Sequence, residues 1–286
     1  MSITKKISLV TITYNSEKTI FRLLASLKFI KNYLNEIIII DNNSQKNQSK
    51  NIQKISKKIK LIQNKKNIGF AKAANQGIKI AKSDFILLLN PDTYLEDNSV
   101  IKTITKIQNN KKIGAIGGLI LNENNKKQFT ANNKTNFMTG LFEFTILKRV
   151  FPNNKYSKKF WIENKKIKKP TKVNSLCGAY TIIRKFINKK LNLFDENFFL
   201  YLEDIDIGTS INQKGYSVVL DPDSHIKHIG GASSNNKYKT DLNSWYKSRK
   251  IFFKKHLNKF NGIILIVIFS IEEFILKIIQ YLKDEK

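Results

Sequence analysis

The chain has 286 residues, and 41% of them are hydrophobic, which supports a packed core and argues against general disorder. Its single cysteine, Cys177, excludes an internal disulfide framework and a cysteine-based zinc site, and it fits a reducing compartment. The formal net charge of +29 is carried almost entirely by lysine, so it predicts attraction to nucleic acid, acidic lipid or a phosphorylated carrier. Biased genomic composition explains the lysine excess equally well.

The first 120 residues alternate apolar runs with amphipathic stretches. Strands are expected over residues 7–13, 37–40, 60–63, 85–89 and 113–120, and helices around 20–27, over 71–81 and near 97–109. This order predicts an α/β fold with a mixed, mainly parallel sheet flanked by helices. Polar loops follow several of these strands, at the sheet edge where open α/β sheets bind ligands. No small-residue cleavage site follows the first apolar run, so no signal peptide is expected.

Residues 122–172 are rich in asparagine and lysine, with scattered aromatic residues. We interpret this segment as a long, partly mobile excursion on the acceptor side of a site; a solvated lysine surface is the alternative. After it, a strand is expected over 173–183 and a helix from near Glu203 to Gln213, where a Lys-Gly pair ends it. A strand over 216–220 and a helix over 238–256 complete the predicted domain of residues 1–256.

The C-terminal segment, residues 257–286, contains an uncharged run from 260 to 271 that Glu272, Glu273 and Lys277 soon interrupt. This run is too short to cross a bilayer, which needs about 20 apolar residues. Its lysine flanks and its Phe, Ile and Leu content favour an amphipathic helix that lies on a membrane surface. A helix packed on the body or in a homodimer is the alternative.

Three carboxylates, Glu203, Asp204 and Asp206, stand directly behind the apolar run 198–202. Carboxylates at the edge of a buried run are costly unless they face a polar cleft or a cation. Asp92 similarly ends a buried run, and His228 lies in a segment that holds two of the three histidines. Acids and a histidine at the ends of buried segments indicate a metal-assisted active site.

Seven segments together resemble glycosyltransferase family 2, particularly its rhamnosyltransferase-like members. They are residues 10–16 (VTITYNS), 40–44 (IDNNS), 67–77 (NIGFAKAANQG), 87–93 (LLLNPDT), 177–184 (CGAYTIIR), 194–206 (FDENFFLYLEDID) and 228–234 (HIGGASS). Any one of them is weak, but seven in order over residues 7–256 are specific. The resemblance implies a GT-A (Rossmann-like) fold, a nucleotide-diphosphate-sugar donor linked to dTDP or UDP, a divalent cation, and transfer with inversion at the anomeric carbon.

The resemblance also implies roles for single residues. Asp204, at a helix start whose dipole keeps it ionised, is the expected catalytic base that takes the proton of the acceptor hydroxyl, with Glu203 as the runner-up. Glu203 and Asp206 are expected to bind the acceptor, although Asp206 could instead cap the helix. The residues expected to bind the nucleotide-sugar donor are Thr11, Asn15, Asp41, Gly69, Asn75, Asn90 and Asp92. Arg249 is equally consistent with contact to the diphosphate and with a surface role.

The family's Asp-x-Asp-type metal motif reads Asn90-Pro91-Asp92 here. Because Asn90 is neutral, the cation is expected to rely on Asp92, on His228 and on the donor's diphosphate oxygens. Oxygen ligands with one imidazole suit Mn²⁺ or Mg²⁺ rather than a structural zinc. His225 has no counterpart in the motif and is expected to be structural.

The function expected from this resemblance is transfer of rhamnose or another hexose to a lipid-linked or glycan acceptor in cell-surface polysaccharide synthesis. A basic nucleic-acid-binding protein is one alternative, but the aromatic residues lie in apolar runs rather than among the cations, so no specific nucleic-acid partner is expected. A sugar nucleotidyltransferase is another, but the N-terminal segment lacks a glycine-rich basic loop. The expected location is cytoplasmic, with peripheral contact at the inner face of the cell membrane.

Overall fold

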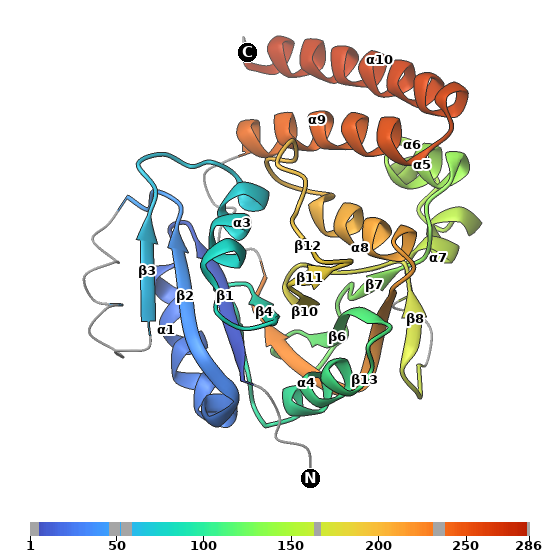
Figure 1. The fold of residues 1–286 in the computed structure, drawn as a ribbon. Helices are drawn as coiled ribbons and strands as arrows, with labels where there is room; N and C mark the ends of the chain where they lie inside the picture. The colour runs from blue at the N-terminus through green and yellow to red at the C-terminus, as the bar shows by residue number, and fades with distance from the viewer. Residues whose placement is uncertain (1–5, 46–51, 53–58, 163–166, 231–237, 285–286) are drawn as a thin grey trace.

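The computed structural model describes residues 6–45, 52, 59–162, 167–230 and 238–284 (Figure 1). The elements up to residue 121 are β1 (Ile7–Thr13), α1 (Glu17–Ser26), η1 (Leu27–Tyr33), β2 (Leu34–Asp41), β3 (Ile59–Gln63), α3 (Phe70–Ile80), β4 (Phe85–Leu89), β5 (Thr93–Tyr94), α4 (Val100–Asn109) and β6 (Ile113–Leu121). Each strand and helix expected in this half is present, with bounds that differ by a few residues.

The second half is more finely divided. Its elements are β7 (Ala131–Asn132), α5 (Phe137–Glu143), α6 (Leu147–Val150), α7 (Lys155–Phe160), β8 (Thr171–Val173), β9 (Ser175–Leu176), β10 (Tyr180–Arg184), β11 (Phe186–Ile187), β12 (Lys190–Leu191), α8 (Glu203–Gln213), β13 (Ser217–His228), α9 (Tyr238–His256) and α10 (Lys259–Asp284). The predicted helices at 203–213 and 238–256 are both confirmed.

A nine-stranded mixed sheet forms the centre of the fold, in the order β3-β2-β1-β4-β10-β6-β13-β5, with β8 also paired to β13. β1, β2, β3 and β4 are parallel, and β6 is parallel to β13, while β10 runs antiparallel to both of its neighbours. The carboxyl ends of β1, β2 and β4 therefore share one edge, and the loops that follow them carry the polar residues of the predicted site.

Both faces of the sheet are buried, as the continuous apolar runs predict. On β2, Ile37 and Ile39 join the core cluster under α1 and α4, whereas Ile38 and Ile40 join the cluster under α3 and α8. Successive side chains of a strand point to opposite faces, which explains why one run serves two cores.

Three expectations for the second half are wrong in detail. The strand expected over 173–183 is broken into β8, β9 and β10, because the chain turns around Gly178 between the last two. The strand expected over 216–220 continues to His228. The 122–172 segment is not a mobile excursion where it is described, since it contains β7, α5, α6 and α7, and its residues Phe144 and Phe160 are buried in the main core.

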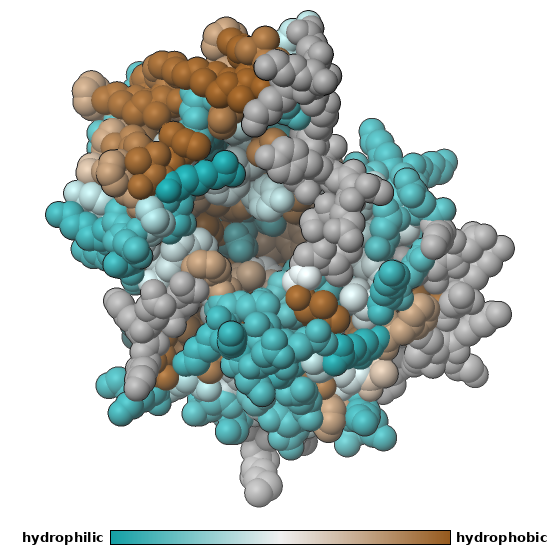
Figure 2. All heavy atoms as spheres, turned by 180° about the vertical axis from the view of Figure 1, so that it is seen from behind, coloured by the Kyte–Doolittle hydropathy of each residue, from teal (hydrophilic) through white to brown (hydrophobic). Residues whose placement is uncertain are grey.

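α9 and α10 lie together across one end of the molecule (Figure 1), and α10 also contacts α5. Both glutamates of α10 turn toward α9, where Glu272 pairs with Arg249 and Glu273 pairs with Lys250. Their charges therefore do not interrupt the outer face. That face is apolar over its whole length (Figure 2), through Phe260, Ile263, Val267, Ile271, Phe274, Ile275, Ile278, Ile279, Tyr281 and Leu282.

Within the described residues, no helix is both long enough and apolar enough to span a membrane.

Candidate functional site

The turn between β9 and β10 joins the two halves of the predicted site. The backbone N–H of Gly178 donates to Oδ2 of Asp204 at 3.2 Å, from the helix α8 side. The carbonyl oxygen of Ala179 accepts from the N–H of Asn90 at 3.2 Å, from the β4 side. Hydrogen bonds thus connect two segments, more than 100 residues apart in the chain, to adjacent residues of one turn.

Carboxylates from both halves of the site raise the pKa of the same thiol, that of Cys177. Burial, together with the negative charges of Asp204, Glu203 and Asp92, raises the pKa of Cys177 to about 12. Because Coulomb energy falls with distance, three carboxylates that all influence one buried group lie close to it and to one another. This shared influence on Cys177 is consistent with the expected convergence of Asp92 with the 203–204 pair, which stays a prediction.

A strained backbone turn sets the direction of the two acids. Tyr201 and Leu202 both have left-handed backbone conformations, with φ of 71° and 67°, immediately before α8 begins at Glu203. Such non-glycine conformations cost about 1–2 kcal/mol each and persist where surrounding contacts hold them. They place Glu203 and Asp204 on the first helical turn, facing the turn at Gly178.

Burial controls the ionisation of this pair. It raises the pKa of Asp204, and hydrogen bonds from the backbone N–H groups of Gly178 and Ile205 oppose that rise. Burial also raises the pKa of Glu203 to about 8, and the neighbouring charge of Asp204 adds to the effect. This rise from burial opposes the effect of the helix dipole, which favours the ionised form of Asp204. A raised pKa brings a carboxylate closer to neutral pH, where it is a stronger base.

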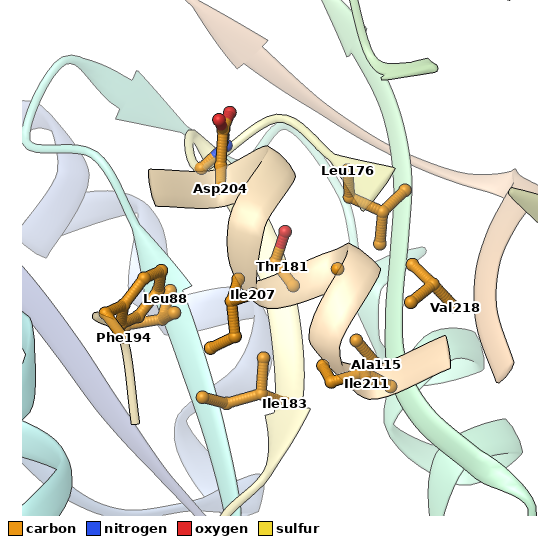
Figure 3. A pocket seen from close by; sticks show the side chains of 12 residues that line it. Leu88, Ala115, Leu176, Thr181, Ile183, Phe194, Asp204, Ile207, Ile211 and Val218 are labelled. Carbon is orange, nitrogen blue, oxygen red and sulfur yellow. Dashed lines mark hydrogen bonds between the residues drawn. The ribbon is translucent and has the colours of Figure 1, made fainter. Parts of the chain in front are cut away.

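Below Asp204, α8 lies on a small apolar cavity, shown in Figure 3, of about 20 Å³ between Leu88, Ile183, Phe194 and Ile211. The carboxylate of Asp204 points away from this cavity at the helix start, while the aliphatic side chains point into it. A cavity of this size, lined mostly by aliphatic side chains with Thr181 and Asp204 as its polar ones, belongs to the core.

Asp92 and His228 face each other at the other side of the turn. Oδ1 of Asp92 lies 3.2 Å from Nε2 of His228, where β5 pairs with the end of β13. Nδ1 of His228 lies 2.7 Å from Oε1 of Gln128, whose Nε2 donates to the His228 carbonyl at 3.0 Å. The Gln128 oxygen can only accept, so it accepts from Nδ1–H, and a neutral imidazole would then direct the lone pair of Nε2 at a carboxylate oxygen of Asp92.

Two electron-rich atoms at this distance repel each other unless a proton or a cation lies between them. An imidazole whose other nitrogen is held by a hydrogen bond is the usual form of a metal-ligating histidine. The donor set of Asp92 and His228 thus fits Mn²⁺ or Mg²⁺. In the part of the chain that the structure describes, no group of three or more His, Cys, Asp or Glu residues surrounds one metal position.

The loops after β1 and β2 hold each other on the predicted nucleotide side. Oδ1 of Asp41 accepts from both the N–H and the hydroxyl of Ser44, and Ser44 in turn accepts from the N–H of Asn15. Asn15 has a φ of 52° and its side chain accepts from the N–H of Gln45. Thr11 lies on β1, fully buried, with its hydroxyl unpartnered among the described residues.

Two predicted donor-binding residues have structural partners instead. The N–H and carbonyl of Phe194 bond to the side-chain amide of Asn75, which is 1% exposed. Gly69 has a φ of 84°, and a Cβ built there would lie 2.6 Å from the carbonyl oxygen of Phe199. The close approach that needs glycine is thus to the chain segment before α8. Both residues hold the segment that carries the acids.

Asp206 and Arg249 also have structural partners in place of the binding roles expected for them. Asp206 is 2% exposed and bonds to Nε2 of His256 at 2.7 Å and to Lys255 at 2.8 Å, so it joins α8 to α9 rather than facing the site. Arg249 is fully buried and donates to the carbonyls of Phe144 and Phe269 and to Glu272, far from any diphosphate role. His225 lies 3.5 Å from Asp97, outside the site, as expected.

Two site residues escaped the sequence reasoning. Gln128, which orients His228, lies in the segment interpreted as an excursion, and no local pattern marks it. Asn42 is 3% exposed and its side chain bonds to Asn64, Asn67, Ile68 and Gly69, so it holds the loops after β2 and β3 together. Its position directly after Asp41, at a strand end, was the available signal. Residues 231–234 of the last matching segment lie outside the described residues.

The sheet order and the acids at its carboxyl edge define a GT-A-type fold with a nucleotide-sugar-type site. The family model for "Glycosyl transferase family 2" matches residues 8–191, well over half of the chain. The chain therefore belongs to glycosyl transferase family 2, and it is a glycosyltransferase. This decides against the nucleic-acid-binding and nucleotidyltransferase alternatives.

Among relatives, the chain is 23% identical over 261 residues to the N-acetylglucosaminyl-diphospho-decaprenol L-rhamnosyltransferase of Mycobacterium tuberculosis, covering 87% of this chain and 84% of that protein. It is 26% identical over 211 residues to the poly-beta-1,6-N-acetyl-D-glucosamine synthase of Staphylococcus aureus, covering 73% of this chain and 46% of that one.

Solved structures share the fold. GalNAc-T7, solved with UDP, GalNAc and Mn²⁺, superposes with a TM-score of 0.65 at 17% identity, covering 87% of this chain and 48% of that chain, so this chain spans about half of its length. The mannosyltransferase PcManGT from Pyrobaculum calidifontis, solved with GDP-Man and Mn²⁺, gives 0.57 at 15% identity, covering 89% and 64%.

Proposed function

We propose that the protein transfers a sugar, with inversion, from a nucleotide diphosphate donor to a hydroxyl of a lipid-linked or glycan acceptor in cell-surface polysaccharide synthesis. The observation that carries the proposal is that one turn, 177–179, holds Asp204 on one side and the Asp92 loop on the other. An inverting transfer needs such an arrangement, because the base and the leaving diphosphate lie on opposite sides of the anomeric carbon.

Asp204 is the proposed base. The hydrogen bonds from Gly178 and Ile205 fix its carboxylate, and its raised pKa favours uptake of the acceptor proton as the hydroxyl oxygen attacks. Asp41, Asn15 and Thr11 are the proposed nucleotide contacts. Asn90 remains a proposed donor contact, while Gly69 and Asn75 support the site indirectly.

Asp92 and His228 are the proposed ligands of Mn²⁺ or Mg²⁺, with Gln128 holding the imidazole. When bound, the cation supplies Lewis-acid neutralisation of charge on the departing diphosphate. With only these two protein ligands, the cation would have coordination positions left for the diphosphate oxygens of the donor. The relatives named for rhamnose and N-acetylglucosamine transfer support a dTDP- or UDP-linked sugar, with rhamnose as the first donor to test.

The test is release of nucleoside diphosphate from a panel of nucleotide sugars in Mn²⁺ with a mixed glycolipid acceptor fraction. Asp204→Asn should lower turnover by about 10²–10⁴-fold, the usual contribution of general base catalysis. Asp92→Asn should raise the Mn²⁺ concentration needed for activity. Asp97→Asn, a change of the same kind beside His225, is the matched control and should retain turnover. Full turnover in both site variants would remove the basis for this assignment.

We also propose that the outer face of α10 contacts an anionic membrane surface. Its apolar side chains are exposed, with Phe274 at 66% and Ile271 at 55%, and both glutamates of the helix are paired inward. The exposed lysines Lys254 and Lys259 flank its first turn, where they complement acidic headgroups.

Flotation with phosphatidylglycerol-containing vesicles tests this contact, with pure phosphatidylcholine vesicles as the neutral arm. Ile271→Glu with Phe274→Glu should abolish flotation, whereas Phe186→Glu, at an exposed position remote from α10, should not. If light scattering instead showed a dimer that the double variant disrupts, while flotation stayed unchanged, the face would be a contact between two copies of the chain.

A further inference from the structure

A pocket of about 220 Å³ opens in front of Glu203 and Asp204. Its walls come from three separate parts of the chain: the 122–172 segment, the strained turn before α8, and α9. Since a liquid water molecule occupies about 30 Å³, the pocket holds roughly seven waters, which suits one sugar ring better than a polymer.

Two pairs of aromatic rings line the pocket. The ring centroids of Phe129 and Trp161 lie 4.4 Å apart, and those of Tyr201 and Trp245 lie 5.9 Å apart in a T-shaped pair. Nε1 of Trp161 donates to Glu143 at 2.7 Å, which fixes the plane of that ring. Flat apolar surfaces held in place in this way match the C–H faces of a pyranose ring.

The charge of the pocket is opposite to that of the chain. Three carboxylates, Glu143, Glu203 and Asp204, line it, and no lysine, arginine or histidine is among the described residues of its lining. The chain carries 51 lysine and arginine residues against 22 acids, so a lining without cations is notable. Lys148, which is not among the lining residues, pairs with Glu143 at 2.8 Å and neutralises its charge. A phosphate group beside Asp204 would still meet a carboxylate with no cation in the described lining, whereas a sugar hydroxyl can donate to it.

Glu203 has a carboxyl oxygen that could accept a hydrogen bond from such a hydroxyl. Its Oε2 is buried and has no hydrogen-bond partner within the described part of the chain, although buried carboxylate oxygens are normally paired. A ligand hydroxyl at this point would satisfy it.

We propose that this pocket binds a terminal uncharged sugar ring of the acceptor, so that a sugar hydroxyl and not a lipid phosphate receives the transferred group. The inference rests on the proposed sugar transfer and names its acceptor class. Asp204 removes the proton of the attacking hydroxyl, the new bond forms between that oxygen and the donor's anomeric carbon, and the bond to the diphosphate breaks with its electron pair. Because the pKa of Glu203 is raised to about 8, its carboxyl is mainly protonated at neutral pH and can donate to the sugar as well as accept.

The two tryptophans of the chain, Trp161 and Trp245, both line this pocket, so intrinsic fluorescence reports on its occupancy directly. The probes are octyl β-D-glucopyranoside, octyl N-acetyl-β-D-glucosaminide, octyl α-L-rhamnopyranoside and octyl phosphate, which share one alkyl chain. A saturable change with at least one glycoside, and none with octyl phosphate at tenfold higher concentration, is expected. No glycoside response, or a response to octyl phosphate of equal affinity, overturns the inference.

Variants separate this inference from the proposed transfer. Trp161→Leu should weaken glycoside binding by tenfold or more, whereas Trp161→Phe, which keeps an aromatic face, should weaken it by less than threefold. The slow release of nucleoside diphosphate by water in the absence of acceptor, measured in the unmodified protein, reports on the donor side alone. If the unmodified protein released no nucleoside diphosphate from any donor, the proposed function would be wrong. If it cleaved a donor and transferred the sugar to octyl phosphate, only the proposed acceptor class would be wrong.

Discussion

Gly69 provides a direct test of how the acid-bearing segment is held. Alanine at this position combines two costs. The backbone has a φ of 84° and a ψ of 166°, a region confined almost entirely to glycine, and side chains forced into such regions cost about 1–3 kcal/mol. The new Cβ would also lie 2.6 Å from the Phe199 carbonyl oxygen, a backbone atom that cannot rotate away.

The Phe199 carbonyl accepts from the N–H of Phe70 at 2.7 Å. Moving it loses a buried hydrogen bond worth about 0.5–1.5 kcal/mol. Together these effects predict that Gly69→Ala lowers the free energy of unfolding by about 2–4 kcal/mol. They also shift the segment between Phe199 and Asp204, so turnover should fall by tenfold or more under conditions where the variant is folded.

Gly215→Ala is the matched control, because Gly215 has a φ of 82° but nothing lies within 4 Å of the added Cβ. It should cost only the backbone term, about 1–2 kcal/mol, and leave turnover unchanged. Urea unfolding monitored by tryptophan fluorescence gives the two stabilities, and nucleoside diphosphate release gives the two rates. Equal losses of stability and equal activity in both variants would refute the role assigned to the Phe199 contact.

Three further changes test other contacts. Gln128→Leu should weaken Mn²⁺ binding by about 10–100-fold, since it removes the group that orients a metal-ligating histidine, and Mn²⁺ titration by electron paramagnetic resonance measures this; an unchanged affinity would contradict the metal assignment. Arg249→Met should lower the free energy of unfolding by about 3–5 kcal/mol in a urea titration, against less than about 1 kcal/mol for Lys250→Met at the partly exposed pair, and similar losses would show that burial of the first pair is unimportant. Above its ordinary pKa, Glu203 releases its proton in the unfolded chain but keeps it in the folded protein. The free energy of unfolding should therefore decline between about pH 4.5 and 8, and Glu203→Gln should make that decline shallower. Identical slopes for the two proteins in urea titrations would exclude a raised pKa.

Most of the fold could be predicted from the sequence, because apolar periodicity reports burial directly. The runs at 37–40 and 85–89 form internal strands of the sheet, each paired on both sides, and their continuous apolar sequences predict strands buried on both faces. The broken strand at 173–183 could not be predicted in this way. Its sequence, VNSLCGAYTII, mixes apolar with small and polar residues, and only the contact of Gly178 with Asp204, distant in the chain, shows why the strand turns there.

Site residues at strand ends could be located from the sequence, whereas the two acids of α8 were grouped without regard to the face of the helix on which each lies. Asp204 and Asp206 lie two residues apart, which on an α-helix places them about 200° apart around the axis. They cannot face the same pocket, and the structure turns Asp206 toward α9. Helical geometry alone, applied to the first turn of α8, would have separated them.

Gln128 and Arg249 illustrate a different limit. Each acts through partners 20 or more residues away, and neither belongs to a local pattern. A buried arginine needs several acceptors at fixed angles, and here they come from α5 and α10. Such a set exists only after the helices have packed, so no window of sequence contains it.

α9 is the element through which the proposed membrane contact and acceptor pocket are connected. Trp245 lines the pocket, and Ser248, one turn further along the helix, donates to the carbonyl of Leu200 in the strained turn. Arg249, the next residue, fastens the same helix to α10. A rigid helix that bonds to both partners fixes the pocket relative to the apolar face, so docking of α10 on a bilayer would set the height of the pocket above the headgroups. A lipid-linked acceptor then needs no large movement of the protein, because its sugar and its lipid meet two surfaces of one packed unit.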